Sequence, residues 1–598
     1  MLLQWLIGVA GVACTFGVSR LLINLWWRPW QIYKALQAQG VRGPPFIPIW
    51  GNQPEVVRLM AEASSTPMNL SSNEIAPYVF PHYTRWSKIY GEMFVYTFGS
   101  EVRLTITDPE LMKEILSNKF GHFPKVSPSA LDRDLLGDGL VLAQGEKWAH
   151  QRQIINPGFH VDKLKAMVET MAKLSTKMLN DWEGRIVETK QPNGVEIEVR
   201  EEYQNLTADV IAQTAFGTNY QEGKMVFRLQ YYQLKMAQEE RESIRFPGQS
   251  ILPTAKNIHR RKIRKAIEDN LRQIVEKRLQ SESQNEVQHS DLLGIMITAY
   301  KGQLRGNVQK SLTMSIQDIV DECKTFFFAG HDTTASLLTW TTMLLALHPD
   351  WQERARAEVI KVCCSTHPSS DMLNQLKLVG MVINEALRLY PVASTLTRCT
   401  NRDSKVGKYV VPKGTVLYLL LLATSHNKQL WGEDASNFNP ERFSGGIASA
   451  SKHPLAFMPF SVGPRNCIGQ VFALMEAKVV LCKLLQRFSF HLSPTYVHAP
   501  AQTVILKPRH AWTYPIGALF LPDVQSRRRW PRSKILVLRR SSWRSKHQTH
   551  LSHQGDLQGQ KWSHQGSHIK AKDSKLRVSH PLLMLYLVLK NHLMLKMH

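Results

Sequence analysis

The chain has 598 residues, of which 43% are hydrophobic and 21% charged, a balance typical of globular proteins. Its formal net charge is +25, and residues 524–598 alone hold 16 Lys and Arg against 2 Asp and Glu, a net +14. The mildly basic remainder suits an acidic partner or a membrane surface, and without a nucleic-acid-binding motif we expect no nucleic-acid partner. Seven cysteines without a CxxC pair argue against a disulfide framework and favour a reducing compartment.

The first 27 residues are nearly all apolar, with Arg20 the only charged side chain. Such a run is long enough to cross a bilayer. It lacks the preceding Lys or Arg of a cleaved signal peptide, whereas Arg20, Arg28, Lys34 and Arg42 lie towards its end and beyond it. Because positive charge favours the cytoplasmic side, we expect residues 1–27 to be a single transmembrane anchor with the body in the cytosol; a cleaved signal peptide is the alternative.

Residues 28–50 are basic and contain Pro44, Pro45 and Pro48, which predict a stiff, extended linker. Residues 51–510 then alternate long segments of helical period with shorter strand-like runs such as EVRLTITD, KYVVPKGTVLYLLL and FSFHLS. There is no internal repeat and no regular alternation of strand and helix. The pattern predicts one mainly α-helical domain with small β-sheets.

A lone cysteine lies in the stretch PFSVGPRNCIGQ, just before a helix that we expect to start near Gln470. Pro464 fixes its own φ, and Gly463 and Gly469 allow tight turns. Free N–H groups and the positive end of the helix dipole favour a thiolate at Cys467. A dry thiolate without an adjacent base suits permanent metal ligation. The alternative is a buried cysteine in a turn without a ligand. The spacing Phe-x-x-Gly-x-Arg-x-Cys-x-Gly favours haem ligation.

This stretch resembles the haem-binding loop of the cytochrome P-450 monooxygenases. The resemblance implies the cytochrome P-450 fold and haem b as cofactor, with Cys467 as the axial ligand of the iron, Phe460 packed near it and Arg465 paired with a haem propionate. It extends over residues 30 to 510, which identifies residues 51–510 as the catalytic domain.

The segment from Met314 to His348 predicts a long helix, with Ser315 and Asp318 as its capping box. Its centre is AGHDTT, where glycine and short polar residues have low helix propensity, a conflict that indicates function in a buried helix. The resemblance implies that a kink here lies over the haem. By it, Ala329 and Gly330 make room for dioxygen, Thr333 donates a hydrogen bond to bound dioxygen and Asp332 relays protons from solvent.

Glu385 and Arg388 lie three residues apart on one predicted helix face, where an exposed ion pair is the ordinary interpretation. Together with NPERF, they resemble the Glu-Arg-Arg structural triad of the family, completed by Arg442. The resemblance also implies that Trp148 and Arg152 reach the haem propionates. Arg398 is a further propionate candidate and His426 a weaker one.

FFFAGHDTT, LWGEDASNFNPERF and HPLAFMPFSVGPRNCIGQ resemble a plant clan that includes hydroxylases of brassinosteroids, gibberellins and triterpenoids, which implies an apolar steroid or terpenoid substrate in hormone or secondary metabolism. The other implied partners are O2, NADPH–cytochrome P-450 reductase and the lipid bilayer of the endoplasmic reticulum, with the catalytic domain facing the cytosol. The pocket regions that the resemblance implies are residues 120–139, Phe327 and Phe328, residues 391–395 and residues 496–504; ordinary core packing is the alternative.

Residues 511–598 depart from the family pattern and form a basic tail. The tail is either disordered chain that binds anionic lipid or RNA, or translated non-coding sequence. Two alternatives to a monooxygenase stay open, and only the second of them depends on this tail. One is a haem-thiolate isomerase or dehydratase, against which the pair Asp332 and Thr333 argues, and the other is a non-functional, membrane-tethered product of the altered C-terminus.

Overall fold

The computed structural model describes residues 2–118, 121–189, 195–217, 220–241, 249, 252–285, 291–305, 313–364, 366–509 and 517–522. The chain begins with the helix α1 (Leu2–Leu22), which continues through a π-helical segment (Ile23–Trp27) into α2 (Arg28–Ala38). Within the described ranges, Gln4–Ala38 is the one helix long and apolar enough to cross a membrane, and it is a candidate anchor.

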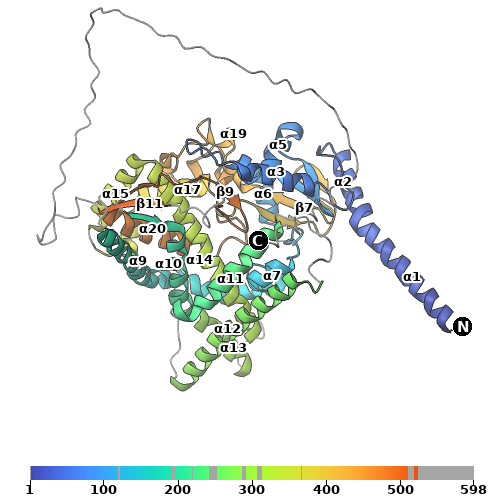
Figure 1. Ribbon diagram of the computed structural model, residues 1–598, viewed down its shortest axis with the longest axis horizontal. Coiled ribbons are helices and arrows are strands. Elements are labelled where there is room, and N and C mark those ends of the chain that lie inside the picture. The colour runs from blue at the N-terminus through green and yellow to red at the C-terminus, as the bar shows by residue number, and fades with distance from the viewer. Residues whose placement is uncertain are drawn as a thin grey trace, which may run out of the picture. The chain divides into compact units, whose positions relative to one another are not determined.

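The other described α-helices are short around the N-terminal sheet and long in the centre of the chain (Figure 1). In chain order they are α3 (Gln53–Ser65), α4 (Ala76–Val79), α5 (Pro81–Tyr90), α6 (Pro109–Leu116), α7 (Ala130–Leu136), α8 (Gly145–Ile155), α9 (Val161–Thr189), α10 (Val199–Phe216), α11 (Tyr220–Arg241), α12 (Ala255–Asn285), α13 (Leu292–Arg305), α14 (Ile316–Leu347), α15 (Pro349–Cys363), α16 (Ser370–Gln375), α17 (Lys377–Leu389), α18 (Leu421–Ser425), α19 (Lys428–Trp431) and α20 (Gln470–Arg487).

The strands form small sheets, as the sequence predicts. In the largest, β1 (Val95–Phe98) pairs antiparallel with β2 (Glu101–Ile106), β2 runs parallel to β7 (Val416–Leu419), and β7 pairs antiparallel with β4 (Leu396–Cys399). The remaining strands are β3 (Val195–Glu198), β5 (Ser404–Val406), β6 (Tyr409–Val411), β8 (Phe488–Leu492), β9 (Pro500–Gln502), β10 (Leu506–Pro508) and β11 (Gly517–Pro522).

Helix α14 lies in the core, packed against α10, α12, α17 and α20 (Figure 1). The predicted capping box is confirmed: Asp318 N donates to Ser315 Oγ, and Ser315 N donates to the Asp318 carboxylate. Beyond this cap the side chains are buried for most of the helix, polar ones included. A helix buried on all sides positions its polar side chains rigidly, which is what a site in its centre requires.

The N-terminal linker differs from the expectation of an extended spacer over residues 28–50. Its first part is helical in α2, and Tyr33 and Leu36 are buried in a core cluster with strand residues such as Val95 and Leu104. The Tyr33 hydroxyl also donates to the Pro44 carbonyl at 2.6 Å. Prolines shape only the second part, so this segment belongs to the folded body.

The C-terminal end of the folded domain also differs from the predicted boundary at residue 510. Strand β11 inserts between β3 and β8 and pairs antiparallel with both, in the register Ala518 to Leu492 on one side and Ala518 to Ile197 on the other. The folded chain therefore reaches Pro522. The predicted tail otherwise, residues 511–516 and 523–598, lies outside the described residues.

Candidate active site

A cavity of about 310 Å³ lies between α14 and the loop of residues 459–469. Its wall is mostly apolar and includes Leu140, Phe326, Leu337, Val392 and Phe472. Among the residues predicted from the sequence, the cavity brings together Trp148, Arg152, Ala329, Gly330, Thr333, Phe460, Arg465 and Cys467. Segments more than 300 positions apart in the chain thus form one apolar chamber.

The loop that carries Cys467 is held by its own backbone. Cys467 N donates to the Phe460 carbonyl at 2.9 Å, and Asn466 N donates to the Gly463 carbonyl at 3.1 Å. Gly463 has φ 79°, and a Cβ there would lie 2.5 Å from the Leu116 carbonyl oxygen, so only glycine fits. The tight turn fixes the thiol at the cavity wall.

Cys467 lines the cavity and its side chain is exposed there, and α20 begins three residues later, as predicted. Burial raises the pKa of Cys467 and outweighs the hydrogen bond from the Gly469 N–H and the charge of Arg152, which lower it, so the net pKa is raised. The protonated thiol is therefore favoured when nothing is bound, and a bound cation would favour the thiolate.

Two arginines and a tryptophan form one side of the cavity. The Arg465 guanidinium carbon lies 4.5 Å from the centre of the Trp148 ring, and Arg465 Nη2 donates to the Ala143 carbonyl at 2.7 Å. Arg152 Nη1 donates to the Asn466 carbonyl at 3.0 Å. Arg465 Nη1 is buried without a hydrogen-bond partner among the described residues. A buried, unsatisfied guanidinium donor indicates a place for an anion.

Lys125 joins this cationic group, and sequence reasoning did not single it out. Burial, Arg465 and Arg398 together lower the pKa of Lys125 to about 7. Arg398 is buried and donates to the Thr397 carbonyl at 2.8 Å. In the described part of the chain, none of the cations Lys125, Arg152, Arg398 and Arg465 forms an ion pair with an acidic residue. A ligand with negative charge would remove this repulsion.

Thr333 contributes a hydroxyl to the opposite wall. Its Oγ1 donates to the Ala329 carbonyl at 2.6 Å, four residues back along the same helix. Gly330 also lines the cavity, yet a Cβ added to it would meet Ile211 at 2.7 Å. The glycine is therefore required for close packing of α14 on α10, a reason that the sequence did not reveal.

Asp332 is buried and points to α10 instead of lining the cavity. Its Oδ1 accepts from Arg200 Nη2 and from Gln204 Nε2, both at 2.8 Å, while its Oδ2 has no partner in the described structure. Burial raises the pKa of Asp332, but the charges of Arg200, Lys507 and His331 and the Gln204 hydrogen bond together outweigh it, and the net pKa is lowered. The carboxylate is ionised and keeps one oxygen free to accept a proton.

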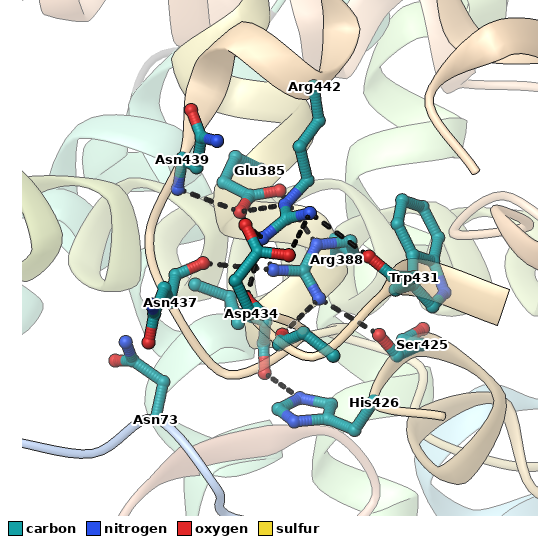
Figure 2. Close-up of polar contacts among 12 residues, drawn as sticks. Asn73, Glu385, Arg388, Ser425, His426, Trp431, Asp434, Asn437, Asn439 and Arg442 are labelled. Atoms are coloured by element: carbon teal, nitrogen blue, oxygen red, sulfur yellow. Dashed lines mark hydrogen bonds and ion pairs between the residues drawn. The ribbon is translucent and has the colours of Figure 1, made fainter. Parts of the chain in front are cut away.

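The predicted triad is assembled in the structure (Figure 2). Glu385 and Arg388 are fully buried and form two parallel contacts of 2.7 Å. Arg388 also donates to the carbonyls of Ser425, Ala435 and Asn437. The bidentate pair is therefore satisfied on every charged atom, the condition under which a buried pair is tolerated.

Arg442 Nε lies 3.4 Å from Glu385 Oε1, and Arg442 Nη1 donates to Asp434 Oδ1 at 2.9 Å (Figure 2). Asp434 is thus a fourth charged member, which the motifs did not indicate. His426 Nε2 donates to the Leu389 carbonyl at 2.9 Å, and the ring does not line the cavity. The structure therefore does not support His426 as a candidate for the propionates. Arg398 does not line the cavity either, but its charge acts on Lys125 and Arg465, which do.

The predicted pocket regions meet the cavity only in part. Val392 and Ala393 line it, but Phe327 stacks on Phe216 at 4.5 Å and Phe328 packs in a separate apolar cluster. The face of α14 that lines the cavity is instead the set Thr325, Phe326, Ala329, Gly330, Thr333, Thr334 and Leu337. Residues 496–504 do not line the cavity, Lys125 is the one residue of 121–139 that does, and Phe120 lies outside the described residues.

Comparison with known proteins agrees with this geometry. The family model "Cytochrome P450" matches residues 67–511. The chain is 44% identical to Cytochrome P450 734A1 of Arabidopsis thaliana over 493 residues, which cover 81% of this chain and 92% of that protein. It is 42% identical to Cytochrome P450 CYP72A616 of Paris polyphylla over 486 residues, 81% of this chain and 93% of that protein. The chain therefore belongs to the cytochrome P450 family of haem-dependent monooxygenases.

Proposed function

We propose that the cavity would hold haem b and that the Cys467 thiolate would bind its iron. The observation that carries this proposal is the combination of an apolar chamber, a thiol at its wall and cations without acidic partners at its edge. A planar apolar group with two carboxylates matches that donor set, because the thiolate binds the metal and the cations neutralise the carboxylates.

The residues that would hold the propionates are Trp148, Arg152, Arg398, Arg465 and, beyond the family motifs, Lys125. Arg465 Nη1 is the best supported of these donors because it is buried and unsatisfied. Glu385, Arg388 and Arg442 do not touch the cavity, and their proposed role is to brace the layer that carries the Cys467 loop.

The haem, when bound, supplies the redox chemistry that activates dioxygen. The residues of α14 supply protons: Asp332 Oδ2 takes a proton from the solvent side, and the Thr333 hydroxyl presents it to the cavity. Supporting this order, Asp332 is ionised behind the cavity wall while Thr333 is part of the wall. Arg200 and Gln204 hold the other oxygen of Asp332 and so keep Oδ2 available.

The substrate that we propose is an apolar steroid or terpenoid, which gains one oxygen atom while the other leaves as water. The mostly apolar wall of the cavity supports this class of substrate. The cations of the cavity lie near the thiol of Cys467, so the rest of the wall can contact an apolar molecule. NADPH–cytochrome P-450 reductase would supply the electrons, and the anchor helix α1 would hold the chain in the endoplasmic reticulum membrane with the body in the cytosol.

The decisive test is the spectrum of the reduced, carbon-monoxide-bound protein. We expect the strongly red-shifted Soret band of a haem thiolate, lost in Cys467→Ala and retained in Cys364→Ala, which removes an exposed thiol. Absence of the band from the unaltered chain would refute haem-thiolate chemistry and favour a non-functional product. Product formed without NADPH, reductase or O2 would favour an isomerase or dehydratase.

A further inference from the structure

Two cysteines from different helices meet below the surface, where the end of α15 packs against α20. Cys363 is the last residue of α15, and Cys482 lies in the second half of α20. Both side chains are buried, at 1% and 0% exposed, and the two thiols share a hydrogen bond. The two residues are more than 100 positions apart in the chain, so it is the fold that brings the two sulfurs into contact.

Polar contacts beside the thiols hold the end of α15 on α20. Gln486, one turn after Cys482, donates from Nε2 to the carbonyls of Cys364 and Thr366 at 3.1 and 3.2 Å. Thr366 in turn donates from its backbone N and from Oγ1 to the Cys363 carbonyl, at 3.0 and 2.8 Å. Two sulfurs can be joined without movement of the backbone only when their chains are already held in this way.

The two thiols differ in acidity. The hydrogen bond from Cys482 and the charge of Lys483 lower the pKa of Cys363 and outweigh burial and the charge of Glu358, which raise it. The contact with Cys363 and burial raise the pKa of Cys482. Lys483 is itself buried, and in the described structure it forms no ion pair with an acidic side chain. Cys363 is therefore the sulfur that ionises more readily, and an ionised sulfur is the one that attacks an oxidant.

The pair lies directly below an exposed residue. Helix α15 ends at Cys363, and the next residue, Cys364, is exposed and has φ 49°. Helix ends fray, and such local openings admit molecules of the size of water. Hydrogen peroxide is little larger than water, whereas glutathione is far larger. The position of the pair therefore favours a small oxidant over a bulky thiol reagent.

We propose that Cys363 and Cys482 are a modification site at which hydrogen peroxide forms a reversible disulfide that cross-links α15 to α20. The Cys363 sulfur attacks one oxygen of the peroxide, the O–O bond breaks, and the other oxygen leaves as hydroxide, which takes up the proton that Cys363 had released. The Cys482 sulfur then forms the S–S bond, and the hydroxyl on Cys363 leaves as water with the Cys482 proton. The two thiols lose two electrons, and the peroxide gains them.

The cross-link has a structural consequence and a means of reversal. It closes a loop of more than 100 residues, which restricts the unfolded chain and so stabilises the folded one. A dithiol reductant of the cytosol restores the two thiols. The inference rests on the proposed function only for one source of the oxidant, the peroxide that a monooxygenase releases when turnover is uncoupled, and peroxide from any other source serves equally.

The test treats the purified full chain with hydrogen peroxide, blocks the remaining thiols with iodoacetamide after denaturation, and maps the unreduced peptides by mass. We expect the peptides that hold Cys363 and Cys482 as one species, two hydrogen atoms lighter than their sum, which dithiothreitol separates. The midpoint of thermal unfolding should rise by about 5 °C on oxidation. In Cys482→Ala we expect neither the cross-link nor the rise, and dimedone should label Cys363 as a sulfenic acid. Lys483→Met should form the cross-link about threefold more slowly.

The matched controls are Cys323→Ala, which removes a buried thiol of α14, and Cys364→Ala, which removes the exposed neighbour; both should keep the cross-link. Free thiols at Cys363 and Cys482 after peroxide has oxidised Cys364 would overturn the proposal, as would a cross-link through Cys364. An equal rate in Lys483→Met would overturn the order of attack.

The cross-link is measured on the unaltered chain, so the result stands even if a variant does not fold. A chain that forms the cross-link with added peroxide but binds no haem would refute the proposed function alone. A haem-loaded chain that does not form the cross-link would refute this inference alone.

Discussion

Two buried charge clusters of this protein differ in how completely their polar atoms are used. In the Glu385–Arg388 pair each carboxylate oxygen and each guanidinium nitrogen has a hydrogen-bond partner, and the one exception near the pair is Arg442 Nε, which lies 3.4 Å from Glu385 Oε1 in the described structure. Near the cavity, Asp332 Oδ2, Glu322 Oε1 and Arg465 Nη1 are buried without one in the described structure. A saturated cluster fixes a structure, whereas an unsaturated one retains capacity for a ligand or a proton.

The largest effect should come from breaking the saturated cluster. Arg388→Ala removes the bidentate partner of the buried Glu385, which keeps only the Asn439 N–H and the 3.4 Å contact with Arg442, and we expect a loss of about 3–5 kcal/mol in the free energy of unfolding together with failure to retain haem. Denaturant unfolding and haem content measure both. Arg58→Ala, which removes an exposed pair with Glu62, should change stability by less than about 0.5 kcal/mol. Equal effects of the two variants would contradict the comparison.

In the cluster near the cavity, where buried polar atoms lack partners, we expect substitutions to reduce activity more than they reduce the free energy of unfolding. Thr333→Ala removes a hydroxyl whose one described hydrogen bond is to its own helix, so the fold should survive, while product formation falls about 100-fold as reductant is diverted to peroxide. Thr339→Ala is the matched control, because Thr339 makes the same bond to Ala335 at 2.6 Å but does not line the cavity. Unchanged coupling of reductant to product in Thr333→Ala would remove the threonine from proton delivery.

The cations at the cavity edge should make haem binding depend on pH. The pKa of Lys125 is about 7 in the folded chain, below its value in an unfolded one, so the unfolded state binds more protons above pH 7 and the haem-free protein gains stability as pH rises. Carboxylates favour the charged lysine, so haem binding takes up a proton, and haem affinity should fall about tenfold between about pH 7 and pH 9. Haem titrations of the unaltered chain and of Lys125→Met measure this; the same slope in both would exclude Lys125.

We expect the smallest effect at Gly330, where the change in stability should show whether the glycine is needed for packing against α10 or for space in the cavity. Gly330→Ala places a Cβ 2.7 Å from Ile211, and we expect a loss of about 1–2 kcal/mol in stability. Gly184→Ala in α9, where nothing lies within 4 Å of the new Cβ, should gain up to about 1 kcal/mol instead. Thermal unfolding compares the two, and recovery in Gly330→Ala/Ile211→Ala would confirm the steric cause. No recovery would indicate that the glycine is needed for another reason.

The sequence predicted those features that local rules govern. The capping box of α14, the start of α20 and the strands β2, β7 and β8 follow from residue pattern, and the spacing around Cys467 identified the family. The assembly of Glu385, Arg388 and Arg442 was accessible through the family motifs alone, since an i,i+3 pair carries little information by itself.

Other features depend on contacts between distant segments and left no local signal. Arg200 meets Asp332 across 132 positions, and Lys125 meets Arg465 only because a loop folds over the cavity. The prediction that Phe327 and Phe328 line the pocket was wrong, although Ala329, Gly330 and Thr333 line it as predicted: the phenylalanine on the cavity face of α14 is the neighbouring Phe326. The packing of α14 against α10 sets which of its side chains face the cavity, and the sequence of α14 alone does not contain this information.

The contact between α2 and the first sheet has a mechanical consequence. Because Tyr33 and Leu36 belong to the same packed cluster as β1 and β2, force or rotation applied at the N-terminal helix passes directly into the body instead of being absorbed by a swivel. A soluble form of the protein should therefore start near Arg28, not near Gly51. A chain that starts near Gly51 would lack α2, which packs on the first sheet, and would leave Val95 and Leu104 facing solvent.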